Sequence, residues 1–146
     1  GAAADAAAPT VTAGHGQALP TLAELTRPRF LTEPQRLLYL VLRAALPDHI
    51  VMANTRMVDL LDLPAGAEAL QRDARLREML QQRLDCVVCR QDFVPVAALV
   101  VYAPGVANAP DERIQAERLR ELGLKFLRLR SDSLPRPAEM RALVLG

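Results

Sequence analysis

The sequence is poor in aromatic residues: phenylalanine, tyrosine and tryptophan make up 3% of 146 residues, and tryptophan is absent. Proteins that bind single-stranded nucleic acid without sequence preference stack bases on aromatic rings, so this scarcity argues against that class. No run of eighteen apolar residues occurs, which argues against a transmembrane helix in this stretch of chain. The formal net charge is +1, so no overall field draws the protein towards nucleic acid or an anionic membrane.

Cysteine is also scarce, with Cys86 and Cys89 in a Cys-x-x-Cys spacing. A redox pair needs its first thiol at a helix N-terminus, whereas these two lie in an apolar run typical of a strand. A zinc site needs two further ligands at similar spacing, and neither His15 nor His49 supplies one. We therefore expect two buried thiols, no disulfide and a reducing compartment.

Composition divides the chain into an arm and a domain. Residues 1–30 form a linker or arm rich in Ala, Gly and Pro near its start, with Leu22 to Leu25 as a candidate for one helical turn. Residues 31–146 are long enough to bury the core of a single domain. Because the arm has few sizeable apolar side chains, ordering it would require an outside surface, and we hypothesise a weak homodimer through arm exchange. Those side chains are Val11, Leu19, Leu22 and Leu25.

Hydrophobic periodicity predicts alternating helices and strands in the domain. Residues 32–46 read as a helix that a Thr32–Gln35 capping box begins, and Pro47 ends it. Further helices are expected over residues 67–83, 108–122 and 138–145, and strands over residues 49–53, 84–102 and 124–129. We expect His49, at the mouth of the first strand, to be a solvent-facing loop residue. The order of elements predicts a layered α/β domain.

Residues 84–102 are the centre of this pattern, with two apolar runs around the polar turn Arg90-Gln91-Asp92. Such an arrangement predicts a β-hairpin, and the second run is apolar on both faces, as in a strand covered by helices. The first run contains a single charge, Asp85. A buried carboxylate is costly unless it is paired, hydrogen-bonded or bound to a metal, so Asp85 is the best functional candidate in the sequence.

The hairpin and its flanks resemble the core of a bacterial family, domain-of-unknown-function family 2726, a branch of the PD-(D/E)xK nuclease superfamily. The resemblance rests on Leu84 to Cys89, Pro95 to Tyr102, the helix start at Leu31 to Gln35, and Gly123 to Leu129. It implies a restriction-endonuclease-like αβββαβ core, with a mixed sheet and flanking helices. It also implies a bacterial domain facing the cytoplasm and held by a membrane segment upstream of residue 1.

The resemblance further implies a degenerate active site. The family's metal-binding aspartate falls on Asp85, but its Glu-x-Asp or Glu-x-Lys pair falls on Val100 and Tyr102. The other remnants are Gln115 and Glu117 in the helix after the hairpin, and Arg128 in the last strand. We expect Asp85 to have become structural, accepting hydrogen bonds from Arg83, Arg128 or the Tyr102 hydroxyl.

Two classes of function stay open. The first is a non-catalytic binding or assembly module of the nuclease fold, with no cofactor and no catalytic metal site at Asp85. The alternative is an endonuclease acting on DNA or RNA, dependent on a divalent metal such as Mg²⁺, in which Asp111, Glu112 or Glu117 supplies the missing ligands. A nucleic-acid partner has weak support in the arginines of residues 67–83, which we interpret as a solvated helix face. They are Arg72, Arg75, Arg77 and Arg83.

Overall fold

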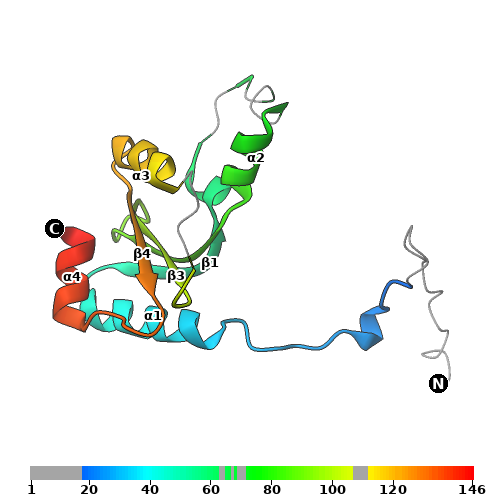
Figure 1. Cartoon of the computed structure of the whole chain (residues 1–146), viewed down its shortest axis with the longest axis horizontal. Coiled ribbons are helices and arrows are strands. Elements are labelled where there is room, and N and C mark those ends of the chain that lie inside the picture. Colours follow the sequence, from blue (N-terminus) through cyan, green and yellow to red (C-terminus); the bar gives the residue numbers. More distant parts are fainter. Residues whose placement is uncertain (1–17, 63–64, 67, 69–71, 107–111) are drawn as a thin grey trace. The chain divides into compact units, whose positions relative to one another are not determined.

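The computed structural model describes residues 18–62, 65–66, 68, 72–106 and 112–146 (Figure 1). The chain divides into two compact units, residues 1–30 and residues 31–146. In the first unit, Leu22–Glu24 forms a 3₁₀ turn (η2), which confirms the expected helical turn. The backbone N–H of Thr21 donates to the Glu24 carboxylate at 2.9 Å, and this bond fixes the start of the turn.

A four-stranded mixed sheet forms the middle of the second unit, in the order β1-β2-β3-β4. Its strands are β1 (Ile50–Arg56), β2 (Arg83–Cys89), β3 (Pro95–Tyr102) and β4 (Lys125–Arg130). Neighbours are antiparallel except β3 and β4, which are parallel and joined through helix α3 (Glu112–Glu121). The predicted hairpin and the predicted α/β class, with a mixed sheet and flanking helices, are confirmed.

Helix α1 (Glu33–Ala45) and helix α4 (Pro137–Leu145) cover one face of the sheet (Figure 1). The predicted capping box is confirmed: Thr32 Oγ1 accepts from the Gln35 N–H at 3.3 Å, and Gln35 Oε1 accepts from the Thr32 N–H at 2.9 Å. The buried face of α1 repeats at helical spacing. Its members are Gln35, Leu38, Leu42 and Ala45.

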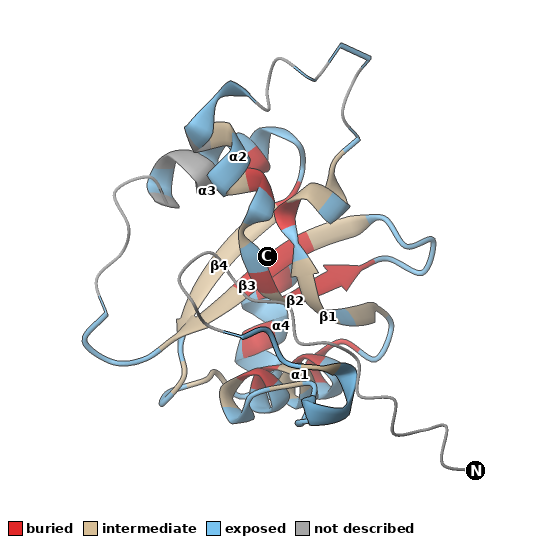
Figure 2. Cartoon of the chain, turned by 90° about the vertical axis from the view of Figure 1, so that its right-hand side faces the viewer, coloured by how far each residue is buried: buried red, intermediate tan, exposed pale blue. Residues whose placement is uncertain are grey.

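The opposite face of the sheet contacts α3 and the 3₁₀ helix η3 (Met57–Leu60). Because β2 and β3 carry apolar side chains on both faces, one core lies on each side of them, and Figure 2 shows the buried residues gathered there. Helix α2 (Ala74–Gln81) lies within the range predicted as a helix, residues 67–83, of which residues 67 and 69–71 lie outside what the structure describes. Asp73 accepts from the Leu76 N–H at 3.3 Å, as an N-cap does, so the helix begins after it.

The turn between β2 and β3 contains an unusual conformation. Arg90 and Val94 close it with an N–H to carbonyl bond of 2.9 Å, and Asp92 binds the Arg90 guanidinium at 2.8 Å. Phe93 has φ of 65° and is 64% exposed. This left-handed region is the one that glycine or asparagine occupies readily, whereas a bulky side chain there is strained.

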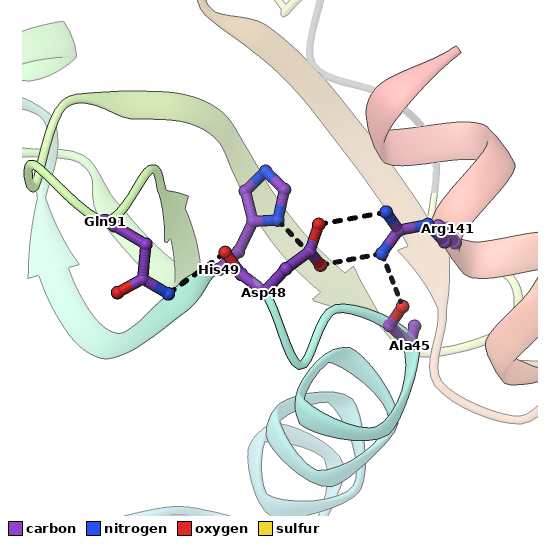
Figure 3. Close-up of polar contacts among 5 residues, drawn as sticks. All are labelled: Ala45, Asp48, His49, Gln91 and Arg141. Carbon is purple, nitrogen blue, oxygen red and sulfur yellow. Dashed lines mark hydrogen bonds and ion pairs between the residues drawn. The ribbon is translucent and has the colours of Figure 1, made fainter.

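A polar tie links the end of α1 to α4 and to the β2–β3 turn (Figure 3). The Arg141 guanidinium donates to both oxygens of Asp48, at 2.7 and 3.0 Å, and the Gln91 amide donates to the Asp48 carbonyl. His49 Nδ1 lies 3.1 Å from Asp48 Oδ1, and the His49 side chain is 14% exposed. His49 lies in the bend before β1, as expected for a loop residue, but the expectation that it faces solvent was wrong, because its ring is largely buried beside this tie.

Candidate functional site

Asp85 lies where β2 and β3 separate. The antiparallel pairing of these strands ends at Cys86 and Leu99, so β3 continues past that point without a backbone partner in β2. The Val101 N–H donates to Asp85 Oδ2 at 2.7 Å instead. The carboxylate thus replaces the missing carbonyl of β2 and closes the gap between the strands.

The second oxygen of Asp85 meets a buried amide from helix α1. Gln35 is 5% exposed, and its Nε2 donates to Asp85 Oδ1 at 2.8 Å and to Asn54 Oδ1 at 2.7 Å. Its Oε1 accepts from the Thr32 N–H, as described above, so both polar atoms of the Gln35 amide are hydrogen-bonded. We call Gln35, Asn54 and Asp85 the amide–carboxylate cluster.

Asn54 reaches this cluster through an irregularity in β1. Its neighbours pair with β2 in register, Ala53 with Cys86 and Thr55 with Leu84, while Asn54 itself has φ of 55°. Asparagine tolerates the left-handed conformation better than most residues. The cluster therefore connects the start of α1, the bend in β1 and the divergence of β2 from β3.

The donors to Asp85 differ from those expected. We had named Arg83, Arg128 and the Tyr102 hydroxyl, and the described hydrogen bonds come from a glutamine side chain and a backbone N–H instead. Both donors are neutral, so the carboxylate is held by hydrogen bonding rather than by an ion pair with one of those residues. A carboxylate gains substantially from such bonds because its charge strengthens each of them.

The two positions that the resemblance assigns to the lost motif lie beside Arg128. Val100 is the register partner of Arg128 in the parallel pair of β3 and β4, and it packs against the core on the α3 side. The Arg128 guanidinium carbon lies 3.7 Å from the centroid of the Tyr102 ring. This is a close cation–π stack, so the face of the Tyr102 ring is covered by an arginine from the neighbouring strand.

The remaining candidates lie on α3. Glu117 is exposed, whereas the side chain of Gln115 lies outside what the structure describes, as do residue Asp111 and the side chain of Glu112. Within the described part of the chain, no group of three or more His, Cys, Asp or Glu residues could hold a metal ion. A hard divalent cation needs several converging oxygen ligands, and Asp85 alone supplies one carboxylate.

Both cysteines lie in β2 beside this site, as buried free thiols. Burial, and secondarily the negative charge of Asp85, raises the pKa of the Cys86 thiol to about 12. Burial likewise raises the pKa of Cys89. Both thiols are protonated and poor nucleophiles near neutral pH, which confirms the expectation of buried core thiols and excludes a low-pKa redox cysteine here.

Sequence reasoning identified Asp85 but missed Gln35 and Asn54. A signal for Gln35 was available: it lies three residues before Leu38, on the same stripe as the buried leucines of α1, and a polar residue there needs a buried partner. Asn54 gave a weaker signal, as an asparagine directly after the strand predicted over residues 49–53.

The fold and the cluster define a small α/β domain with a mixed sheet, in which buried polar side chains occupy the point where two strands diverge. The chain belongs to the family described as protein of unknown function (DUF2726), whose model matches residues 27–145. No curated protein and no solved structure matches the chain. In the described residues, no helix is both long and apolar enough to span a membrane.

Proposed function

We propose that this chain is a catalytically degenerate member of the PD-(D/E)xK nuclease-like superfamily that serves as a binding or assembly module. The observation that carries the proposal is the state of Asp85, whose two oxygens accept from Gln35 and Val101. In a metal-dependent nuclease the equivalent carboxylate would direct an oxygen at the cation. Here the same oxygens stabilise the strands.

The neighbouring positions support the same interpretation. Val100 offers no ligand, and the Tyr102 ring stacks on Arg128. A pseudoenzyme retains the fold while its former catalytic positions take up packing roles, and both residues fit that description. The two free thiols in β2 additionally support a reducing setting such as the bacterial cytoplasm.

A calorimetric titration of the full chain with Mg²⁺ and Mn²⁺, paired with cleavage assays on DNA and RNA, tests the proposal. We expect no binding tighter than about millimolar and no cleavage. Cation binding and cleavage that both disappear in Asp85→Ala would establish the alternative, an endonuclease with ligands from elsewhere in the chain.

A further inference from the structure

Helix α1 carries a second apolar stripe on the side that faces away from the sheet. Leu37 is 39% exposed, Leu40 is 47% exposed, and Ala44 is exposed as well. Each of them lies two positions after a member of the buried face of α1, which is about 200° around the helix axis. The three residues therefore point away from the core, and we call them the outer stripe of α1.

The outer stripe makes α1 apolar on two opposite sides. A helix at the surface of a domain usually has one apolar face and a polar face opposite to it. The inner side of α1 packs against the sheet, whereas nothing in the part of the chain that the structure describes buries the outer stripe. Its spacing of three and then four residues is the spacing that packs against another helix.

The charged side chains that border the outer stripe differ between the two ends of α1. Glu33, in the first turn, is 55% exposed and accepts from the Arg36 guanidinium at 2.7 and 3.0 Å. Arg43, in the last turn, donates to the Tyr39 hydroxyl at 3.3 Å and lies 5.9 Å from the centroid of that ring. Arg43 makes no ion pair with any residue that the structure describes, so α1 ends in a cation that lacks an anionic partner.

A second copy of α1 matches this pattern when it lies antiparallel to the first. In a twofold pair centred between residues 38 and 39, Leu37 lies opposite the partner's Leu40, and Glu33 lies opposite the partner's Ala44. One axis thus brings the leucines together and places each glutamate against a small side chain. The contact is isologous, because the same surface serves on both chains.

The charges select this orientation. In the antiparallel pair, Glu33 lies next to the partner's Arg43, so each unpaired arginine gains a carboxylate. In a parallel pair, Glu33 would face Glu33 and Arg43 would face Arg43, and both contacts would be repulsive. Charge complementarity therefore favours a second copy of this chain as the occupant of the outer stripe.

From these observations we infer that the outer stripe of α1 is a contact surface on which a second copy of the chain packs, antiparallel, through its own α1. A helix of 13 residues is about 20 Å long, so the contact belongs to the small and weak class of interfaces, with a dissociation constant of about 0.1–1 mM. The inference names a partner for the assembly role proposed above, but it depends on α1 and not on the amide–carboxylate cluster.

Sedimentation equilibrium of the full chain, at concentrations from about 0.02 to about 1 mM, tests the inference. We expect the average mass to rise from that of a monomer towards that of a dimer. Leu40→Gln should raise the dissociation constant at least about tenfold, because the twofold axis repeats each contact and one substitution changes two of them. Leu143→Gln is the matched control, since this leucine is 41% exposed on α4, and it should leave the dissociation constant unchanged.

A charge exchange tests the orientation. Arg43→Glu places a glutamate next to the partner's Glu33, so association should weaken at least about threefold. Combining it with Glu33→Arg exchanges the two charges and recreates the pair between chains, so association should return to within about twofold of the wild type. Circular dichroism of each variant checks that α1 still forms.

Three results would overturn the inference. The first is a wild-type chain that stays monomeric at about 1 mM. The second is a dimer that Leu40→Gln leaves unchanged, as arm exchange through residues 1–30 would give. The third is a folded charge-exchanged variant that associates no better than Arg43→Glu. Cation binding and cleavage that depend on Asp85 would refute the proposed function instead, and they would leave this inference standing.

Discussion

Replacing Asp85 by asparagine tests the role that the hydrogen bonds assign to it. The carboxylate accepts at both oxygens, from Gln35 Nε2 at 2.8 Å and from the Val101 N–H at 2.7 Å. Asparagine has a single acceptor oxygen, so its amide group must face one of these two donors. Turning the Gln35 amide over would not relieve the conflict, because its Oε1 already accepts from the Thr32 N–H.

The magnitude follows from the bonds that are lost. A hydrogen bond to a charged group contributes about 1.5–3 kcal/mol, and a buried donor left without a partner costs about 1–3 kcal/mol. Asp85 is only partly buried, and water can satisfy part of the deficit, so we expect Asp85→Asn to lower the free energy of unfolding by about 2–3 kcal/mol. For a domain of this size, that corresponds to a melting temperature lower by roughly 8–12 °C.

Urea unfolding followed by circular dichroism measures this change, and a double-mutant cycle assigns it to the cluster. Gln35→Met removes the amide at nearly constant length, and its coupling to Asp85→Asn should be about 1–2 kcal/mol. Glu117→Gln is the matched control, because that carboxylate is exposed on α3. Its loss should change the free energy of unfolding by no more than about 0.5 kcal/mol. The structural role would be refuted if Asp85→Asn left the free energy of unfolding unchanged, or if the effects of Asp85→Asn and Gln35→Met were additive.

Three further predictions concern other features of the fold. Phe93→Gly should be more stable than Phe93→Ala by about 1 kcal/mol, since only glycine relieves the left-handed backbone; equal stabilities in urea would contradict the strain. The Arg141 guanidinium holds the pKa of Asp48 below its ordinary value, so this carboxylate stabilises the fold above about pH 4 and less as the pH falls through its native pKa. Arg141→Gln should then lower the stability at pH 7, with the difference from the wild type shrinking in acid; a pH-independent difference would count against this tie. Burial raises the pKa of Cys86 to about 12, so iodoacetamide at pH 8 should leave this thiol unmodified in the native chain and label it in urea; rapid native labelling would show that β2 is accessible.

The sequence alone determined the elements whose signals are local. The capping box at Thr32 and Gln35 predicted the start of α1, because both of its hydrogen bonds form within four residues of chain. The apolar runs on either side of Arg90 predicted the hairpin, since a strand covered on both faces needs apolar side chains throughout. These signals and the order of the elements were enough to predict the α/β class. The single charge in the first apolar run was enough to identify Asp85 as a candidate.

Only the tertiary structure decided what Asp85 contacts. Gln35 is fifty positions away in the sequence, and the Val101 N–H is free for a side chain only because β2 and β3 stop pairing at Cys86 and Leu99. The start of α2 after Asp73 was missed for a related reason, since periodicity does not reveal which carboxylate will act as the cap. Contacts of this kind depend on where two strands diverge and on which helix covers them. Burial and hydrogen bonding across the whole fold decide both, so no single segment of sequence predicts them.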